Sequence, residues 1–285
     1  MAGKVATLGN SPRGGILETE IHGHAEALKQ LRAPRHAFRA FPEIIEHLRQ
    51  SDSRVLLVDL DGTLVRLRRR PQDVRVSQRA KRILARLAAL PNMTVAILSG
   101  RAARSLEKMV DVKTVRYFGL HGAEGDRTQP RISGEQRRAL HHAKQKARQK
   151  LADFCGVDVE DKGFGFTVHY RGAGPAAVRG ANEALREIMA PLRHALHVLD
   201  GKKVWEVLPR QIPGKGGAMR RLLADSPRAA LAYIGDDEPD EPAFAVLDGH
   251  VTIHVGQNEN THARFYLRNP GEVLRFLDLL EKELR

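Results

Sequence analysis

The sequence predicts an α/β protein whose parallel sheet is covered by helices on both faces and interrupted by a smaller α+β unit. Three observations predict this class. Short apolar runs alternate with amphipathic helical patterns between residues 54 and 122, which is typical of a parallel sheet. From residue 124 to 208, strands alternate apolar and polar residues, as in half-exposed sheets. The first pattern then resumes and continues to the end of the chain.

Bulk composition fits a globular protein with one large domain or two small ones. The chain has 285 residues, of which 42% are hydrophobic, and this is enough to fill a core. Lys and Arg outnumber Asp and Glu by 47 to 34, a net charge of +13, which leaves nucleic acid open as a partner. Aromatic residues are only 5%, so stacking platforms for single strands are not evident. We expect a solvated basic surface and no nucleic-acid binding.

Cysteine content and hydropathy predict a cytoplasmic location. Cys155 is the only cysteine, so no intramolecular disulfide can form, which fits a reducing compartment. No apolar run approaches the roughly 18 residues of a membrane span. The first 15 residues lack the apolar block of a secretion signal. We therefore expect no membrane partner.

Residues 1–50 are expected to form an N-terminal segment that is disordered first and helical later. Residues 1–15 are small and Gly-rich, a composition typical of disorder. Residues 24–50 carry a helical pattern that is interrupted near Pro34 and restarts at Pro42, because proline is favoured at a first helical position.

The sheet domain is predicted in two parts, residues 51–123 and 209–285. In the first part we expect strands at 54–60, 94–100 and 115–122 and helices at 76–90 and 101–110. In the second part we expect helices at 215–225, 241–248 and 272–285 and strands at 230–237 and 251–256.

The α+β unit between these parts spans residues 124–208. It is predicted to hold helices at 134–154 and 174–192, strands at 157–163 and 164–172, and a hairpin over 196–209. The hairpin is expected to turn at Asp200–Gly201, since Asp-Gly is a common turn pair.

Polar side chains follow three of the predicted buried strands. Asp59 and Asp61 end the first strand, Ser99 ends the second at a helix start, and Asp236 follows a later one. Residues i and i+2 on extended backbone point the same way, so the first two carboxylates project together. Ligands bind at the carboxyl ends of parallel strands, and Lys215 opens the helix before the later strand. We expect these groups to form one site.

This set of residues suits phosphoryl transfer with a magnesium ion. Carboxylates this close repel one another unless a cation lies among them, and Mg²⁺ prefers oxygen ligands and accepts substrate phosphate. A helix N-terminus such as that after Ser99 suits a phosphate group. A carboxylate can also act as a nucleophile and form an aspartyl-phosphate.

Four motifs resemble those of the haloacid dehalogenase superfamily of phosphatases. They are DLDGTLV at 59–65, LSGR at 98–101, GKGGAM at 214–219 and GDDEPDE at 235–241. The resemblance implies a Rossmann-like core with a cap domain inserted at 124–208. It implies that Asp59 is the nucleophile and Asp61 the general acid and base, with Ser99 and Lys215 holding the phosphoryl group.

The same resemblance implies a Mg²⁺ site. Asp59, the backbone carbonyl of Asp61 and Asp236 would hold the ion, with Asp240 in support. One departure lies beside these acids, because Pro239 stands where the family usually has threonine, which removes a hydroxyl and a backbone N–H. The basic loop at 66–70 is a second departure.

Cap-region motifs narrow the resemblance to the trehalose-6-phosphate phosphatases. The motifs are GLHGAE at 119–124, VEDKGFGFTVHYR at 159–171 and KKVWEVLP at 202–209. They imply hydrolysis of trehalose 6-phosphate in trehalose biosynthesis. The implied sugar contacts are Arg101, His121, Glu124, Lys162 and Glu206, which can make charged hydrogen bonds to hydroxyls.

Several alternatives stay open from the sequence. The substrate can be another sugar phosphate, such as sucrose phosphate or a glycosyl phosphoglycerate. A remote alternative is that the chain is a basic nucleic-acid-binding protein. Lys162 can instead be a surface cation paired with Glu160 or Asp161, and Trp205 can pack in a core or stack on a sugar. Whether a trehalose-phosphate synthase partner binds is not indicated.

Overall fold

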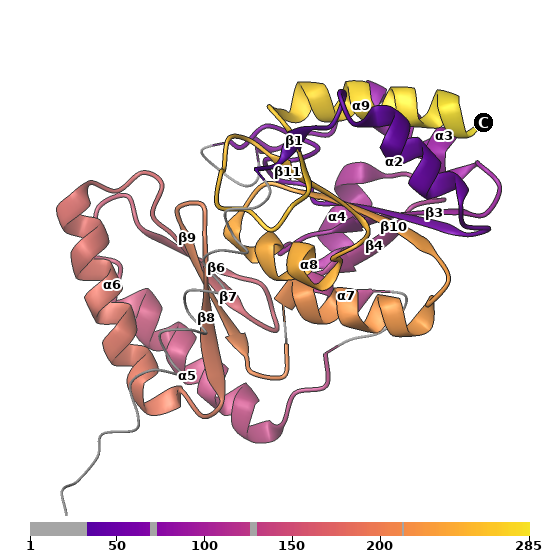
Figure 1. Cartoon of the computed structure of the whole chain (residues 1–285). Coiled ribbons are helices and arrows are strands. Elements are labelled where there is room, and N and C mark those ends of the chain that lie inside the picture. Colours follow the sequence, from indigo (N-terminus) through magenta and orange to yellow (C-terminus); the bar gives the residue numbers. More distant parts are fainter. Residues whose placement is uncertain (1–32, 69–72, 126–129, 213) are drawn as a thin grey trace, which may run out of the picture. The chain divides into compact units, whose positions relative to one another are not determined.

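The computed structural model describes residues 33–68, 73–125, 130–212 and 214–285 (Figure 1). The expected disorder of residues 1–15 and the helical pattern of residues 24–32 lie outside the described residues. The helix expected to restart at Pro42 is present as α2, Phe41–Arg49, with the proline in its first turn. Among the described residues, no helix is both long and apolar enough to cross a membrane.

The larger of two sheets has eight strands in the order β1-β12-β11-β10-β2-β3-β4-β5. All neighbouring strands are parallel except β4 and β5, so the predicted parallel sheet is confirmed. Its strands are β1 Arg35–His36, β2 Arg54–Val58, β3 Met93–Leu98, β4 Arg116–Gly119, β5 Glu124–Gly125, β10 Ala230–Gly235, β11 Val251–Val255 and β12 Phe265–Leu267.

This sheet is buried on both faces, because successive residues of its strands point into two separate apolar cores. In β2, Leu56 and Val58 belong to one core, whereas Val55 and Leu57 belong to the other. The first core is covered by α2, α3 (Gln78–Ala88), α4 (Ala103–Val110) and α9 (Pro270–Leu284). The second is covered by α7 (Gly214–Asp225) and α8 (Glu241–Val246), on the opposite side in Figure 1.

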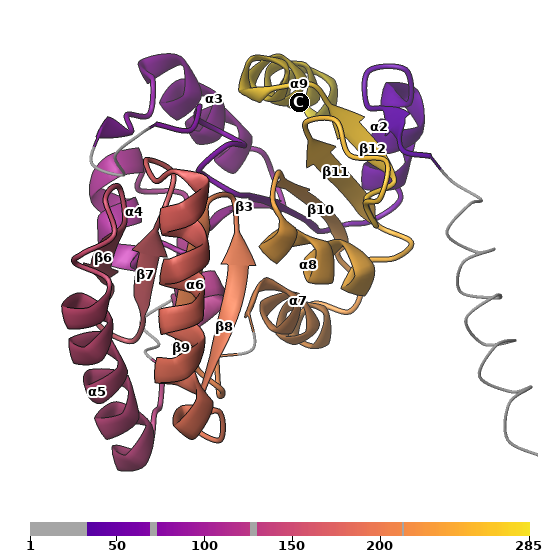
Figure 2. The ribbon, with the colours of Figure 1, turned by 90° about the vertical axis from the view of Figure 1, so that its left-hand side faces the viewer.

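The smaller sheet is antiparallel and has the order β6-β7-β9-β8. Its strands are β6 Asp158–Asp161, β7 Phe166–His169, β8 Leu196–Gly201 and β9 Val204–Pro209. Helices α5 (Gly134–Lys150) and α6 (Pro175–Met189) lie against one face (Figure 2). Val168 and Trp205 pack into the core under these helices, so the alternation of the strands turns Thr167, His169 and Glu206 to the other face.

Strands β1 and β12 are not predicted by the sequence, and β1 lies in the interruption expected between Pro34 and Pro42. These strands have two and three residues, too few to show a strand period. They form because β12 pairs with β11 and β1 pairs with β12 at the edge of the sheet.

The hairpin over 196–209 is present, but its predicted turn is wrong. Asp200 pairs with Trp205 and Gly201 with Val204, so the loop consists of Lys202 and Lys203. Lys203 has a φ of 65°, a conformation that lysine adopts at some cost. The shift moves the hairpin tip to two lysines, and one of them reaches the site described below.

Glu124 and Gly125 form β5 of the larger sheet and pair with β4. The larger sheet therefore extends into the start of the segment expected to be the insert. Helices α5 and α6 and the second sheet lie within 134–209, between β5 and α7.

Two half-buried histidines are expected to make stability fall on acidification. Rings of His47 and His250 meet edge to face at 5.9 Å. Burial lowers the pKa of both, with Arg264 adding to the effect on His47 and His47 to that on His250. The unfolded chain then takes up protons first as the pH falls below about 6.5, so the folded state loses stability.

Thermal unfolding midpoints at pH 7.5 and 5.5 test this for His250→Asn, whose amide keeps a hydrogen-bond acceptor near the position of Nδ1. Burial raises the pKa of Asp236 to about 6, so protonation of this carboxyl stabilises the folded state as the pH falls through the same range. This contribution is the same in the variant and in the unmodified chain. We expect a smaller drop in the variant than in the unmodified chain. Equal drops would contradict the histidine assignment.

Candidate active site

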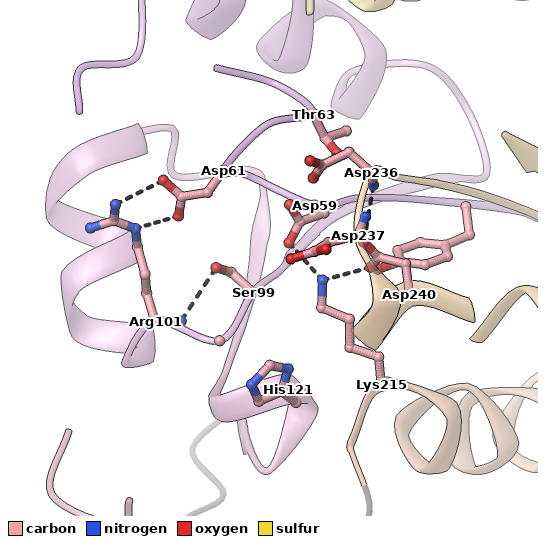
Figure 3. Close-up of polar contacts among 12 residues, drawn as sticks. Asp59, Asp61, Thr63, Ser99, Arg101, His121, Lys215, Asp236, Asp237 and Asp240 are labelled. Carbon is pink, nitrogen blue, oxygen red and sulfur yellow. Dashed lines mark hydrogen bonds and ion pairs between the residues drawn. The ribbon is translucent and has the colours of Figure 1, made fainter. Parts of the chain in front are cut away.

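The site lies where the chain order of the larger sheet reverses. From β2 the chain runs through β3 and β4 on one side, whereas β10, β11 and β12 lie on the other. Asp59 directly follows β2, and Asp236 directly follows β10, its parallel neighbour. Both carboxylates therefore lie at the carboxyl edge of the sheet, the expected place for a ligand, as Figure 3 shows.

Lys215 links two of the acids inside the protein. Its Nζ donates to Asp59 Oδ1 at 2.7 Å and to Asp240 Oδ1 at 2.6 Å, and all three residues are buried. Burial opposes the charge on Lys215, but Asp240 and Asp59 outweigh it and raise its pKa well above the usual value. The lysine is therefore a fixed cation beside Asp59.

Burial also raises the pKa of Asp59 well above its usual value. Lys215 opposes this shift, whereas Asp240 and Asp236 add to it by repulsion. The Asp59 carboxylate is thus poorly solvated and held near like charges, so a bound cation would stabilise its ionised form.

Asp240 fixes the loop after β10. Burial opposes ionisation of its carboxyl, but Lys215 and hydrogen bonds outweigh that effect and lower its pKa. Its oxygens accept hydrogen bonds from Lys215, the Tyr233 hydroxyl, and the backbone N–H groups of Asp236 and Asp237 at 3.0 Å each. Asp240 therefore positions the loop, which fits the supporting role implied by the resemblance.

Pro239 is accommodated in this loop. It lies in the first turn of a short 3₁₀ helix, η4, Glu238–Asp240, where a missing N–H breaks no helical hydrogen bond. The N–H groups that hold Asp240 belong to Asp236 and Asp237, so the proline does not interrupt that network.

Asp61 and Ser99 line the same cavity as Asp59. Both oxygens of Asp61 accept from Arg101, at 2.5 Å from Nε and 2.8 Å from Nη2. Ser99 is buried, and its Oγ accepts from the N–H of Arg101 at 3.3 Å. The guanidinium group of Arg101 therefore holds Asp61, whereas the ammonium group of Lys215 holds Asp59 (Figure 3).

The smaller sheet closes this cavity, which has a volume of about 160 Å³. Glu206 of β9 contacts the His121 ring and accepts from Lys162 Nζ at 2.8 Å. Lys162 Nζ also donates to the backbone oxygen of Gly100 at 3.2 Å. Burial opposes the charge on Glu206, but His121 and Lys162 outweigh it and lower its pKa well below the usual value.

Gly100 allows this close approach of the two sheets. A Cβ at that position would lie 2.9 Å from the His121 ring and 3.0 Å from Glu206 Oε1. Any larger residue would force these side chains apart, so the glycine is required by packing.

Comparison with known proteins gives the family. The sequence model of the trehalose-phosphatase family matches residues 57–270, a segment that contains every acid described above. The chain belongs to the trehalose-phosphatase family.

Relatives agree with this family assignment. The chain is 33% identical over 264 residues to a trehalose-phosphate phosphatase of Mycobacterium bovis (strain BCG / Pasteur 1173P2), covering 86% of this chain and 66% of that protein. It therefore spans slightly under two thirds of that relative. A trehalose-phosphate phosphatase of Mycobacterium marinum is 30% identical, with 99% of this chain and 80% of that protein covered.

Solved structures share the fold. The C-terminal domain of a trehalose-6-phosphate phosphatase from C. albicans aligns with a TM-score of 0.73 and 24% identity, covering 88% of this chain and 98% of that one. A trehalose-6-phosphate phosphatase from Aspergillus fumigatus aligns with a TM-score of 0.60 and 26% identity, covering 87% and 99%. The predicted α/β fold with a capped Rossmann-like core is confirmed by this likeness.

The sugar-contact residues expected for a trehalose-phosphatase divide into two groups. Arg101, His121, Lys162 and Glu206 line the cavity. Glu124 is not among the described residues that line it, because its carboxylate accepts from the N–H of Ala103 at 2.8 Å. It thus satisfies a free N–H at the start of α4.

Two alternatives from the sequence are settled by contacts. Lys162 pairs with Glu206 and faces the cavity, so it is not a surface cation. Trp205 is buried in the core of the smaller sheet and stacks on Tyr170 at 4.2 Å, so it packs and does not line the cavity.

Other residues line the cavity that are not among the expected site residues, including Thr167, His169, Arg171 and Lys202. The period of β7 and β9 could have indicated the first two, because they share a face with Glu206. Lys202 carried no such signal, since it lies in a turn whose position was predicted wrongly.

Carboxylate oxygens of Asp59, Asp236 and Asp240 lie within 4.8 Å of one another and are buried. Oxygen donors clustered in this way fit a hard divalent cation. Gly62, with a φ of 93°, leaves room for this cluster, because a Cβ there would lie 2.7 Å from Asp236 Oδ1. The donor set therefore fits the metal that the resemblance implies.

Proposed function

We propose that this chain is a Mg²⁺-dependent phosphatase that hydrolyses trehalose 6-phosphate to trehalose and phosphate. The observation that carries the proposal is the buried carboxylate of Asp59, paired with Lys215 and facing a cavity closed by Lys162 and Glu206. Membership of the trehalose-phosphatase family and the names of the mycobacterial relatives support the substrate.

In the first step, an oxygen of Asp59 attacks phosphorus and forms an aspartyl-phosphate while the bond from phosphorus to the sugar oxygen breaks. Asp61 donates a proton to that leaving oxygen, which releases trehalose. To carry the proton, Asp61 has to give up one of its two hydrogen bonds to Arg101.

In the second step, Asp61 takes a proton from water, the water oxygen attacks phosphorus, and the bond to Asp59 breaks. Lys215 and the Ser99 hydroxyl bind oxygens of the transferring group and stabilise its charge. Asp59, Asp236 and the backbone carbonyl of Asp61 would hold Mg²⁺, which supplies further positive charge to the phosphoryl oxygens.

We also infer that the smaller sheet moves during the reaction. The cavity volume of about 160 Å³ is below the roughly 300 Å³ of small ligand sites. We infer that the contacts of Lys162 and Glu206 with the larger sheet open to admit a disaccharide phosphate. Closure then excludes water from the reacting phosphate.

Phosphate release from trehalose 6-phosphate, with Mg²⁺ and with a chelator, tests the proposal beside sucrose phosphate and a glycosyl phosphoglycerate. We expect trehalose 6-phosphate to lead the panel and the chelator to abolish release. Faster release from another sugar phosphate would keep the chemistry and reject the substrate. If no phosphate is released from any sugar phosphate, the proposed phosphatase activity is rejected.

Glu206→Gln is expected to raise KM for trehalose 6-phosphate by about 10- to 100-fold with a smaller change in kcat. The glutamate is held in its charged form, and a hydrogen bond to a charged group contributes about 1.5–3 kcal/mol. Steady-state kinetics measures the split between KM and kcat. Glu187→Gln is the matched control, because Glu187 is exposed and pairs with Lys150 on the helical side. An unchanged KM in Glu206→Gln would remove Glu206 from the sugar site.

We also infer a cytoplasmic location. Cys155 is a free, exposed thiol, which suits a reducing compartment. Fractionated cells should carry the phosphatase with a cytosolic marker, and enrichment with membranes or medium would contradict this.

A further inference from the structure

Lys202, at the tip of the β8–β9 hairpin, reaches the two acids that follow β10 of the larger sheet, Asp236 and Asp237. Its Nζ donates to Asp236 Oδ2 and to the backbone oxygen of Asp236, both at 2.5 Å. Its backbone N–H donates to Asp237 Oδ2 at 2.6 Å. Three hydrogen bonds thus join one residue of the hairpin to the two residues that follow β10.

These bonds occupy the carboxylate that the metal needs. Oδ1 of Asp236 accepts from the Thr63 hydroxyl at 3.2 Å, and Oδ2 accepts from Lys202. The Asp236 side chain is 3% exposed, whereas that of Lys202 is 43% exposed. The ammonium group of Lys202 therefore approaches Asp236 from the solvent side. A divalent cation that binds this carboxylate through Oδ2 has to displace the ammonium group.

Lys202 differs from Lys215 in what it neutralises. Lys215 is buried and bridges Asp59 and Asp240 within the larger sheet. Lys202 belongs to the smaller sheet and contacts Asp236 alone among these three acids. A movement of the hairpin therefore removes the charge of Lys202 from the acid cluster and leaves Lys215 in place.

We propose that Lys202 is an internal competitor of the divalent metal: it stands in for the metal at Asp236 when the hairpin is docked, and metal binding expels it. The inference rests on the proposed metal site. Coupling of this kind is reciprocal, so the metal weakens docking of the hairpin as much as the docked lysine weakens binding of the metal. Metal occupancy and opening of the cavity are then linked through one side chain.

Calorimetric titration of metal-free protein with Mg²⁺ alone tests this on the whole chain. We expect Lys202→Met to bind Mg²⁺ about tenfold more tightly than the unmodified chain, because a competing charged hydrogen bond is gone. Lys202→Arg keeps a competing cation and should stay near the original affinity. Lys203→Met is the matched control, since it removes the same charge from the exposed neighbouring position.

Equal or weaker binding by Lys202→Met would overturn the inference, and so would equal tightening in Lys203→Met, which would indicate general charge repulsion. If the unmodified chain binds Mg²⁺ and Lys202→Met gains nothing, only the competition fails. If no protein binds Mg²⁺, the proposed metal site fails and the competition fails with it.

Hydrogen exchange gives a second readout that does not depend on activity. The N–H of Lys202 is protected by Asp237 in the docked hairpin. Adding Mg²⁺ should speed exchange in a peptide that spans the hairpin tip at 200–205. Unchanged or slower exchange there would contradict expulsion of the lysine.

Discussion

Asp59→Asn is expected to lower the rate of phosphate release from trehalose 6-phosphate by about 10⁴-fold or more. Loss of a nucleophile removes the covalent route, and deleting a residue of this kind typically costs several orders of magnitude. Asp61, Ser99 and Lys215 would remain in place, but Ser99 and Lys215 carry no carboxylate, and Arg101 holds both oxygens of Asp61.

The fold should survive this change. Asn has the shape of Asp, and burial disfavours the charge on Asp59, whose pKa is raised well above its usual value. Lys215 keeps its bond of 2.6 Å to Asp240, so no buried cation is left unpaired. We expect an unfolding temperature equal to or above that of the unmodified chain, as is common when a destabilising catalytic group is removed.

Phosphate release and thermal unfolding are measured together on the same preparations. Asp52→Asn is the control, because Asp52 is an exposed acid just before the same strand. If Asp59→Asn keeps more than a tenth of the activity, Asp59 is not the nucleophile. If it loses activity and unfolds early, the loss is structural.

Lys215→Met is expected to lower the free energy of unfolding by about 3–5 kcal/mol. This is the usual range for removing one partner of a buried ion pair, because the remaining charge is uncompensated. Here two carboxylates would be left, those of Asp59 and Asp240, and both are buried. Turnover should be lost as well, since Lys215 contacts Asp59, the proposed nucleophile.

A second substitution separates charge from packing. Lys215→Met combined with Asp240→Asn removes one of the stranded charges, so it should recover part of the lost stability. The deficit of the single variant should also shrink as the pH falls from 7 to 5. Carboxyls without their cation have a raised pKa in the folded state, and protonation then favours folding.

Urea unfolding curves at both pH values measure these differences. Lys282→Met serves as a control, because its side chain is 61% exposed in α9 and pairs at the surface with Asp278. Two outcomes would show that the ion pair of Lys215 and Asp240 does not hold the loop after β10. One is a decrease in the free energy of unfolding below 1 kcal/mol in Lys215→Met, and the other is a double variant no more stable than the single one.

Much of the candidate site at the carboxyl edge of the larger sheet could be predicted from local sequence. Apolar runs such as 55–58 form buried strands, and polar residues that directly follow them lie at the carboxyl edge of a parallel sheet. Asp59, Ser99 and Asp236 were placed by this argument alone, and the structure brings them to one edge. The helix start at Pro42 is equally local, because proline suits the first turn.

Contacts between distant segments could not be predicted in this way. The resemblance predicts that Glu124 contacts the sugar, yet its carboxylate accepts from the N–H of Ala103. The sequence predicts that Lys202 follows the hairpin turn but predicts no contact for its side chain, yet the side chain reaches Asp236. Both outcomes depend on how strands that are distant in sequence pair and how the two sheets meet.

Strand and helix periods, the acids at the strand ends and the resemblance that joins them follow from the sequence alone. The packed fold sets the charged contacts: Lys215 bridges Asp59 and Asp240, Arg101 holds Asp61, and Lys202 occupies Asp236. The two kinds of feature differ in how far along the chain their causes extend. Periods and strand ends follow from backbone geometry over a few residues, whereas the partner of a long charged side chain is set by the packing that surrounds its tip.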